Sequence, residues 1–263
     1  MRQRYGQNFL IDNNIANKIV KVADLSENDN VLEIGPGKGI LTKIISPLVN
    51  NLTAIEIDKK LCEYLRFYFL TKNFKNVNII NFDFLNYVLS TDVCKIISNL
   101  PYNIGTSIIQ KILPLKNWSI SVVMLQKEIA QKMIAKPGDK NYGYISIFVS
   151  YYSHCNVLFD VSPKSFYPIP SVNSSVIKFT NKFKQKADLD ILFFKIVKHV
   201  FNIRRKTILN SISLFEKKLK KELILQIFKR LQIDPSFRPN KLTFFDFLRL
   251  TDEIKKYIIR DKL

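Results

Sequence analysis

Short apolar runs alternate with helix-like patterns over the first half of the chain. Five runs of the length of a buried strand span residues 30–34, 52–57, 78–82, 93–97 and 121–126. Apolar residues at helical spacing accompany them, as at Ile15, Ile19 and Val22. We therefore predict an α/β fold with a doubly wound, mostly parallel, Rossmann-like sheet, whose ligand lies at the carboxyl ends of the strands.

The pattern changes after Tyr144. Two β-rich runs, 147–159 and 175–180, flank the segment 165–170 without a helix long enough for a parallel crossover. We expect them to form an antiparallel hairpin that closes the sheet.

The last part of the chain has a helical pattern. Its apolar stripe consists of Leu189, Leu192, Phe193, Ile196, Val197, Val200 and Phe201. Thr243 with Asp246 resembles a capping box that opens the last helix. The predicted domains are an α/β domain over residues 1–181 and a small all-helical domain over residues 182–263.

The charge of the chain indicates a polyanionic partner. The net charge is +19, with 41 Lys and Arg against 22 Asp and Glu. Residues 181–263 hold 21 of these basic residues and 9 of the acidic ones, a net of +12. Nucleic acid is the first candidate, although abundant Ile, Asn, Phe and Lys also fit the coding bias of a low-GC genome. Within this region, Arg204, Arg205 and Lys206 are predicted to bind RNA.

Cysteine usage and hydropathy indicate a cytoplasmic protein. The three cysteines are widely spaced and accompanied by only two histidines, which supports neither a disulfide framework nor a metal site. No apolar run is long enough to span a bilayer, and the first residues lack the apolar stretch of a signal peptide. We therefore expect no bound metal and no membrane partner.

A glycine turn follows the first buried strand. Residues 30–34 lead into Gly35–Gly39, after which residues 40–49 have helical spacing. A strand, glycine turn and helix bring backbone N–H groups close to a ligand, as in dinucleotide and nucleoside sites.

Acidic residues follow the next two strands. Glu56 lies twenty-one residues after Gly35, the separation at which a carboxylate accepts hydrogen bonds from a ribose diol. Asp83 and Phe84 follow the third strand and offer an acceptor and a ring at the same edge of the sheet.

The segment Ser98–Asn103 combines an amide, a rigid proline and an aromatic ring after an apolar strand. Pro101 pushes Leu100 toward an extended conformation, so neighbouring carbonyls cannot be folded into a helix. An Asn side chain, a fixed carbonyl and the Tyr102 ring suit a planar ring with an exocyclic amine. The alternative is an ordinary turn between a strand and a loop.

Several motifs in order resemble the ribosomal RNA adenine dimethylases of the KsgA type, which act on small-subunit rRNA. They are Gly6–Leu10, Glu33–Gly39, Glu56–Asp58, Asn99–Asn103, Met124–Glu128, Phe166–Pro170 and Phe201–Thr207. The family more often has other residues at Ser98, Gly105, Ser107 and Ser171.

The resemblance implies an S-adenosylmethionine-dependent methyltransferase that dimethylates two adjacent adenines late in assembly of the small ribosomal subunit. Its partners would be small-subunit rRNA and the immature small subunit, and it would act as a monomer. The expected cofactor-site residues are Asn8, Leu10, Gly35, Gly37, Glu56, Ile57, Asp83, Phe84 and Asn99. The expected catalytic residues, around the flipped base, are Asn99, Leu100, Pro101, Tyr102 and Phe166.

Three other functions compete with this interpretation. A nicotinamide oxidoreductase would share the glycine turn and Glu56, but it leaves Asn99 to Tyr102 and the basic tail unexplained. An erythromycin-resistance type methylase would act on large-subunit rRNA; Pro36 and the Arg-rich C-terminal domain favour the small-subunit enzyme. An RNA-binding assembly or transcription factor without catalysis is the third, and the intact Asn99 motif argues against it.

Overall fold

The computed structural model describes residues 8–89, 93–182, 187–216 and 219–258. The chain divides into two compact units, residues 1–130 with 153–182 and residues 131–152 with 183–263. The boundary near residue 182 lies beside the predicted one. Residues 131–152, however, belong to the second unit, because the buried Tyr142 and Ile147 share an apolar cluster with Phe193.

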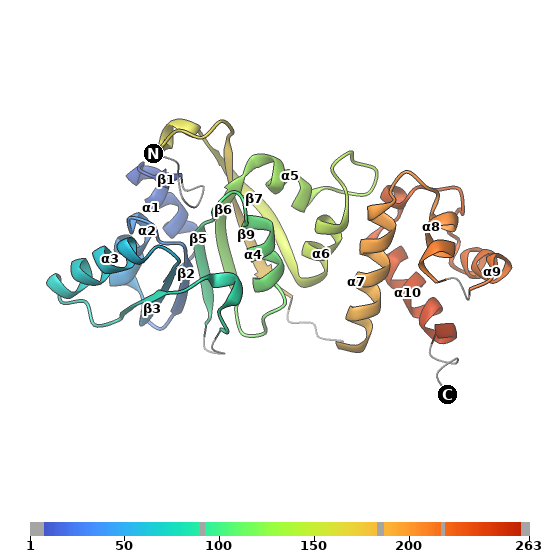
Figure 1. Cartoon of the computed structure of the whole chain (residues 1–263), viewed down its shortest axis with the longest axis horizontal. Coiled ribbons are helices and arrows are strands. Elements are labelled where there is room, and N and C mark those ends of the chain that lie inside the picture. The colour runs from blue at the N-terminus through green and yellow to red at the C-terminus, as the bar shows by residue number, and fades with distance from the viewer. Residues whose placement is uncertain (1–7, 90–92, 183–186, 217–218, 259–263) are drawn as a thin grey trace. The chain divides into compact units, whose positions relative to one another are not determined.

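A seven-stranded sheet forms the centre of the first unit, in the order β4-β3-β2-β5-β6-β9-β7 (Figure 1). The strands are β2 (Asn30–Ile34), β3 (Asn51–Glu56), β4 (Val77–Asn81), β5 (Lys95–Asn99), β6 (Ile120–Gln126), β7 (Ser153–Val161) and β9 (Ser174–Asn181). β2 to β6 are parallel, whereas β9 is antiparallel to both β6 and β7. The structure thus confirms the doubly wound sheet and its antiparallel closure.

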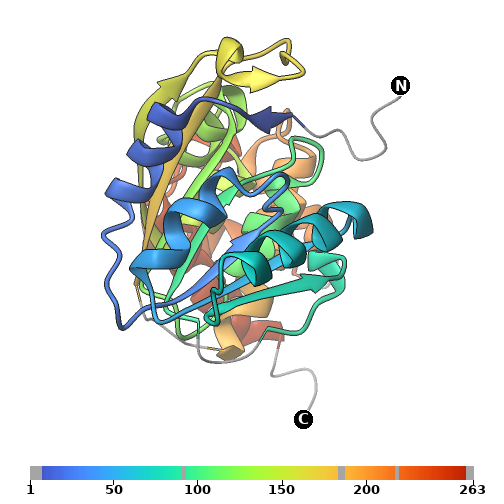
Figure 2. The same ribbon diagram turned by 90° about the vertical axis from the view of Figure 1, so that its left-hand side faces the viewer.

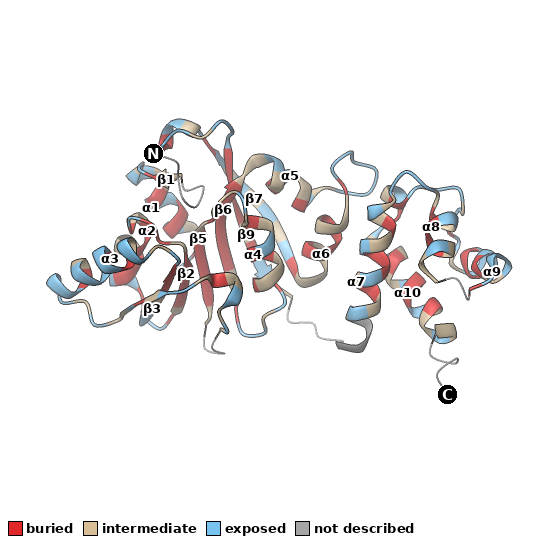
Figure 3. Cartoon of the chain, viewed as in Figure 1, coloured by how far each residue is buried: buried red, intermediate tan, exposed pale blue. Residues whose placement is uncertain are grey.

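Helices cover both faces of this sheet (Figures 1 and 2). They are α1 (Asn13–Val22), α2 (Ile40–Ile45), α3 (Lys59–Thr71) and α4 (Gly105–Ile112). The next helix, α5 (Lys127–Ile134), spans the boundary between the two units. Leu52 packs in the cluster with α1 and α2, and Ala54, on the same face of β3, packs against α3. Right-handed crossovers place α4, between β5 and β6, on the opposite face. The central strands are therefore buried almost throughout (Figure 3).

A second, two-stranded sheet joins residues 9–10 to the segment before β9. β1 (Phe9–Leu10) pairs antiparallel with β8 (Phe166–Tyr167), with Phe9 opposite Tyr167 and Leu10 opposite Phe166. β8 follows the short 3-10 helix η3 (Pro163–Ser165). This pairing holds the N-terminal segment at the carboxyl edge of the large sheet.

The predicted β-rich run 147–159 is a strand only from Ser153 onward. Its first residues lie in α6 (Tyr144–Tyr152), so the prediction was wrong there. Ile147 packs in the apolar core of the second unit, and the Phe148 and Phe194 ring centroids lie 5.1 Å apart. A short continuous apolar run fits a buried helix as well as a strand, and packing decides between them.

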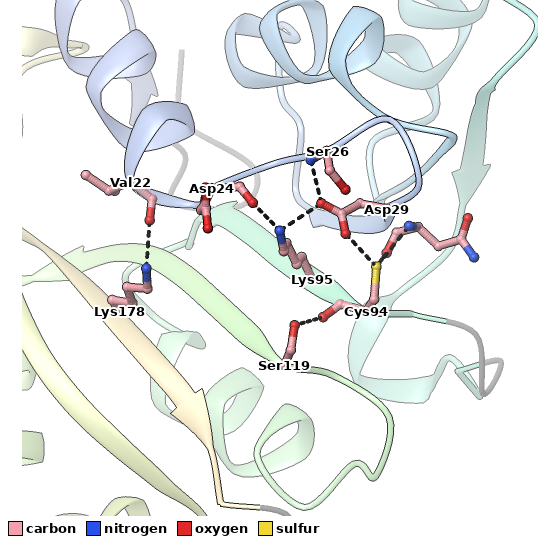
Figure 4. Close-up of polar contacts among 9 residues, drawn as sticks. Val22, Asp24, Ser26, Asp29, Cys94, Lys95, Ser119 and Lys178 are labelled. Carbon is pink, nitrogen blue, oxygen red and sulfur yellow. Dashed lines mark hydrogen bonds and ion pairs between the residues drawn. The ribbon is translucent and has the colours of Figure 1, made fainter.

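Two lysines of the sheet bind carbonyls at the end of α1 and in the turn that follows it (Figure 4). Lys95 donates to the carbonyl of Asp24, and its Nζ lies 2.8 Å from Oδ2 of Asp29. Lys178 donates to the carbonyl of Val22 at 3.1 Å. Cations satisfy the unpaired carbonyls of a helix end and favour its partial negative charge. α1, which directly follows β1, is thereby fixed to β5 and β9.

The second unit is helical, as predicted. It contains α6, α7 (Ala187–Asn202), α8 (Ile208–Phe215), α9 (Lys221–Leu231), the 3-10 helix η4 (Pro239–Lys241) and α10 (Phe244–Ile258). Four residues of the predicted stripe, Phe193, Ile196, Val197 and Val200, are buried in its core. The side chain of Leu189, like the residues Gly6 and Gln7, lies outside the described part.

The last helix begins with the predicted capping box. The Thr243 N–H donates to Oδ2 of Asp246 at 2.9 Å, and the Asp246 N–H donates to Oγ1 of Thr243 at 3.1 Å. Among the described helices, none is both long and apolar enough to cross a membrane.

Candidate functional site

A cavity of about 230 Å³ lies at the carboxyl ends of β2 to β5. Every residue predicted to bind the cofactor lines it, together with the segment Asn99–Tyr102. The predicted residues that line it are Asn8, Leu10, Gly35, Gly37, Glu56, Ile57, Asp83, Phe84, Asn99, Leu100, Pro101 and Tyr102. Residues far apart in the sequence thus surround one hollow, because parallel strands bring their carboxyl ends to one edge.

The glycine turn forms one wall of the cavity. Gly35, Gly37 and Gly39 have φ of 65°, 58° and 79°, a left-handed conformation that glycine adopts without strain. A Cβ on Gly37 would lie 3.0 Å from the ring of Phe9, and one on Gly39 would lie 2.5 Å from Leu65. The turn can therefore approach both the N-terminal segment and α3 only because these positions lack side chains.

Glu56 is a buried carboxylate held by backbone N–H groups. Its side chain is 3% exposed, so it is not a solvated residue at a strand end. Oε2 accepts from the Gly37 N–H and Oε1 from the Asp58 N–H, both at 3.0 Å. Burial raises its pKa, and these two hydrogen bonds oppose the rise. A carboxylate offers about four acceptor positions, so Glu56 can still accept from a ligand hydroxyl.

Asn99 ends β5 and faces the N-terminal segment. Its side-chain amide donates to the carbonyl of Asn8 at 3.3 Å. This bond fixes the direction of the amide group, so its oxygen faces away from Asn8. The Asn99 side chain is partly buried and lines the cavity.

The residues after Asn99 are fixed by the neighbouring strands. The Leu100 N–H donates to Met124 of β6 at 2.9 Å, and the Leu100 side chain is 1% exposed. The hydroxyl of Tyr102 bonds to Oγ of Ser174 on β9. Burial raises the pKa of this phenol. The Tyr102 ring is thus attached to β9 at its far end while it lines the cavity.

Asp83 has a structural as well as a candidate binding role. Oδ1 accepts from the Leu85 N–H at 2.9 Å and Oδ2 from the Asn86 side chain at 2.8 Å. Asp83 thereby caps the 3-10 helix η2 (Phe84–Asn86). The Phe84 ring is buried, and Nζ of Lys111 lies 5.2 Å from its centroid.

The structure does not place Phe166 at the cavity. Its side chain is 1% exposed and packs with Leu10 and Val176 in the core. A contact between this ring and a base would require the ring to leave that cluster. Its neighbour Tyr167 is 64% exposed and lies opposite Phe9, which lines the cavity. Directly opposed residues share a face of a sheet, so the accessible aromatic ring of β8 is Tyr167.

The sequence reasoning did not assign several other lining residues to the site, among them Phe9, Phe82 and Glu33. Phe9 stood inside a recognised motif, and Phe82 is a 47% exposed aromatic ring after β4. Glu33 is 1% exposed, and burial raises its pKa to about 8. A carboxylate inside the apolar run 30–34 is the signal that could have identified it.

The predicted basic cluster lies in the second unit, in the turn between α7 and α8. Arg204, Arg205 and Lys206 are exposed. One guanidinium nitrogen of Arg204 donates to the carbonyl of Lys140 at 3.2 Å. Arg204 and Arg205 line a hollow of about 390 Å³ with Arg238 and Lys241, among others. The folded chain therefore enlarges the cluster by two cations that the sequence pattern did not connect to it.

Comparison with known proteins agrees with this geometry. A family model described as ribosomal RNA adenine dimethylase matches residues 1–256. The ribosomal RNA small subunit methyltransferase A of Malacoplasma penetrans is 40% identical over 244 residues, covering 91% of this chain and 87% of that protein.

Two solved structures have the same fold. A dimethyladenosine transferase from Plasmodium falciparum matches with a TM-score of 0.81 at 27% identity, covering 94% of this chain and 98% of that one. The 23S rRNA methyltransferase ErmE matches with a TM-score of 0.73 at 22% identity, covering 94% and 100%. The resemblance stated from the sequence is thereby confirmed: the chain belongs to the ribosomal RNA adenine dimethylase family and is an S-adenosylmethionine-dependent methyltransferase.

Proposed function

We propose that the chain dimethylates the 6-amino groups of two adjacent adenines in a hairpin of small-subunit rRNA, acting as a monomer on the immature small subunit. The observation that carries this proposal is the convergence of Glu56, the glycine turn and Asn99–Tyr102 on one cavity. A site for a nucleoside and a site for a planar amine then lie side by side. The small-subunit name of the Malacoplasma penetrans relative supports the choice of rRNA.

The cavity residues fit S-adenosylmethionine. Glu56 has acceptor positions left for a ribose diol, and the glycine turn leaves no side chain between the backbone and a ligand. Asp83 and Phe84 offer an acceptor and a ring beyond β4, where an adenine would lie beside its ribose. When bound, S-adenosylmethionine supplies a methyl group on an electron-poor sulfonium.

The role of the protein in the reaction is mainly to align the adenine amine with the methyl group and to polarise this amine. Alignment of two reactants can supply roughly 7–11 kcal/mol of a barrier. The lone pair of the adenine amine is delocalised into its ring. Two hydrogen-bond acceptors would bind the two hydrogens of the amine: Oδ1 of Asn99 and the backbone carbonyl of Leu100. These bonds favour the tetrahedral nitrogen of the transition state. Tyr102 supplies an aromatic face for the base.

Proton removal needs no dedicated base in this scheme. The methylated amine is cationic and acidic enough to lose its proton to water. Tyr102 is not available as the base. Burial raises the pKa of its phenol, so the hydroxyl stays protonated at neutral pH, and it is bonded to Ser174.

The second unit would hold rRNA through its phosphates. Arg204, Arg205 and Lys206 are exposed, and Arg238 and Lys241 line the same hollow. Among the described residues, no carboxylate forms an ion pair with any of these five. Unpaired, exposed cations suit a partner whose affinity comes from counterion release.

A methyl-transfer assay tests the proposal. Tritiated S-adenosylmethionine is offered with immature small subunits, large subunits and naked rRNA, and the labelled nucleosides are identified after digestion. We expect dimethyladenosine in small subunits at up to two residues. Label in large subunits alone would favour an erythromycin-resistance type activity. Subunit binding without any label would favour an assembly factor that lacks catalysis.

A further inference from the structure

Lys111 does not line the cavity, yet it binds the loop that forms one of the cavity walls. It is the last residue but one of α4, and its Nζ donates to the carbonyls of Leu85 and Tyr87 at 2.7 and 2.6 Å. The same Nζ lies 5.2 Å from the centroid of the Phe84 ring. One ammonium group therefore contacts three residues of the loop that follows β4.

This loop has few other attachments. β4 is an edge strand of the large sheet, so the loop after it has a neighbouring strand on one side only. The Phe82 N–H makes the last backbone bond to β3, to the Glu56 carbonyl at 3.0 Å. Within the described part of the chain, the hydrogen bonds that join residues 84–87 to another element come from Lys111.

The position of the ammonium matches the polarity of the loop. Asp83 caps the amino end of η2, whereas Lys111 binds the carbonyls of Leu85 and Tyr87 at the other end. Carbonyls at the end of a helical turn lack a partner within the turn, and a cation there also favours their partial negative charge. Burial lowers the pKa of the Lys111 ammonium, and the Asp83 carboxylate opposes this. η2 is thus fixed at both ends.

α4 carries Lys111 on its cavity side. Ile104 and Ile108 line the cavity, and Lys111 follows Ile108 by three residues. Residues three and four positions apart lie on one side of a helix. Because α4 begins directly after the segment Asn99–Asn103, one helix connects that segment to the loop 84–87.

We propose that Lys111 is a positioning residue for the methyl donor, which holds Phe84 and Leu85 in place to receive the adenine of that ligand. This inference rests on the proposed S-adenosylmethionine site, in which the adenine of the donor lies beside Asp83 and Phe84. A wall that is ordered in advance removes the entropic cost of ordering it when the ligand binds. Lys111 acts through the loop and not on the reacting atoms.

This role separates the affinity for the donor from the rate of methyl transfer. The adenine of the donor is the same in the ground state and in the transition state, because the reaction takes place at the sulfur and at the target amine. Loss of the wall therefore weakens both states equally, which raises KM for S-adenosylmethionine and leaves kcat unchanged.

Lys111→Met removes the ammonium and keeps an unbranched side chain. Calorimetry should show about tenfold weaker binding of S-adenosylhomocysteine and of 5′-methylthioadenosine, by the same factor, because both ligands carry the adenine. Single-turnover methyl transfer to immature small subunits at saturating S-adenosylmethionine should remain near the parental rate. Lys111→Arg keeps the charge and can donate to both carbonyls, so it should restore most of the affinity.

Lys178→Met is the matched control. Lys178 also donates to a main-chain carbonyl, that of Val22, and neither residue lines the cavity. This variant should lose stability in urea unfolding and keep parental affinity for both nucleosides. Equal losses of affinity in Lys111→Met and Lys178→Met would reflect general destabilisation and would overturn the proposal.

Three further results would contradict the positioning role. Parental affinity for both nucleosides in a folded Lys111→Met would assign the lysine to stability alone. A loss confined to S-adenosylhomocysteine would place its effect at the amino-acid end of the ligand. A large loss of rate at saturating donor would place its effect at the target amine.

Hydrogen exchange of the parental protein gives a test if Lys111→Met does not fold. The N–H groups of Leu85 and Tyr87 bond to Asp83 and to the Phe84 carbonyl. They should be protected in the free protein nearly as well as with 5′-methylthioadenosine bound. Fast exchange without the ligand would show that the loop is not held in advance, and it would overturn the proposal. The donor site itself fails differently, because neither nucleoside would then bind the parental chain.

Discussion

The hydroxyl of Ser165 donates a hydrogen bond to Oδ2 of Asp12 at 3.1 Å, across 153 positions of the sequence. Asp12 is the N-cap of α1, and its other oxygen accepts from the N–H groups of Asn14 and Ile15. The Ile11 N–H also donates to the Ser165 carbonyl at 2.9 Å. These contacts continue the pairing of β1 with β8, so residues 9–12, which include part of the cavity lining, are bound directly to residues 165–167.

Ser165→Ala should therefore affect the cavity as well as stability. We expect a loss of about 1 kcal/mol in the free energy of unfolding, the usual value of one intramolecular hydrogen bond. The affinity for S-adenosylhomocysteine should fall as well, because β1 is less firmly held. Urea unfolding and calorimetry measure the two effects. Ser162→Ala is the control, since that exposed hydroxyl accepts from the Lys164 N–H alone among the residues that the structure describes. Equal ligand affinity in both variants would contradict the coupling.

Periodicity predicted the parts of the fold that depend on local pattern. The five strands of the first half and the Thr243 capping box follow from side-chain spacing and short-range hydrogen bonds. The helix over residues 144–152 could not be predicted this way, because its residues are apolar on all sides and only the core of the second unit decides their conformation.

The site residues that the sequence predicts well are polar side chains that end a strand. Glu56 and Asn99 each end a strand, so their side chains meet at one edge. Glu33 was recognised as part of a motif but not as a lining residue, because it lies inside its strand and not at the strand end. Phe166 was placed at the base by resemblance, yet the pairing of β1 with β8 turns its ring into the core and exposes Tyr167.

Lys95→Met should destabilise the fold strongly. Lys95 and Asp29 form an ion pair whose side chains are only 11% and 13% exposed (Figure 4). Removal of one partner of a buried pair costs about 3–5 kcal/mol. Lys178→Met is the control, because it removes an ammonium that binds the last carbonyl of α1 and that has no carboxylate partner within the described part of the chain. Urea unfolding at pH 7 should therefore show a larger loss for Lys95→Met than for Lys178→Met.

The same pair predicts a dependence on pH. Burial raises the pKa of Asp29, but the hydrogen bonds from Lys95, Ser26 and Cys94 outweigh it and bring the pKa below 3.8. A lowered folded-state pKa gives stability that is present above the unfolded value and lost as the pH falls through the folded one. The difference between parental protein and Lys95→Met should thus shrink below about pH 4. An unchanged difference down to the acid transition would show that Asp29 is not the partner that matters.

Glu56→Ala should weaken S-adenosylmethionine binding by about 1.5–3 kcal/mol, the scale of a hydrogen bond to a charged group. The variant also leaves the Gly37 and Asp58 N–H groups without their acceptor. Glu56→Gln, which keeps an acceptor oxygen but no charge, separates the two effects. Calorimetry on folded variants checks the prediction, and unchanged affinity in both would remove Glu56 from the ribose site.

Replacement of Arg204, Arg205 and Lys206 by alanine should weaken rRNA binding and flatten its salt dependence. Each lost phosphate contact lowers the slope of log K against log salt by about 0.7–0.9. Because Arg204 also bonds to the Lys140 carbonyl, thermal unfolding must accompany the titration. Replacement of the exposed Lys220, Lys221 and Lys229 removes the same charge elsewhere in the unit. Equal slopes for the two triple variants would show that only net charge matters.

Asn99→Ala separates a structural from a catalytic role. If Asn99 only joins β5 to the N-terminal segment through the Asn8 carbonyl, the variant loses stability and little else. If its oxygen holds the adenine amine, the variant folds and binds RNA, since most RNA affinity comes from distant phosphates and stacking. Methyl transfer should then fall by roughly 10²–10³, as when one preorganised contact to a developing charge is removed.

Single-turnover rates at saturating S-adenosylmethionine give the decisive comparison, because Asn99 also lines the cofactor cavity. Asn81→Ala is the matched control. The Asn81 amide ends β4 and donates to the carbonyls of Glu56 and Ile57 at 3.0 and 3.1 Å, so its loss disturbs the same edge without touching the amine. We expect near-parental turnover for Asn81→Ala and a large loss for Asn99→Ala. A near-parental rate for Asn99→Ala would transfer the polarising role to the Leu100 carbonyl and leave Tyr102 to orient the base alone.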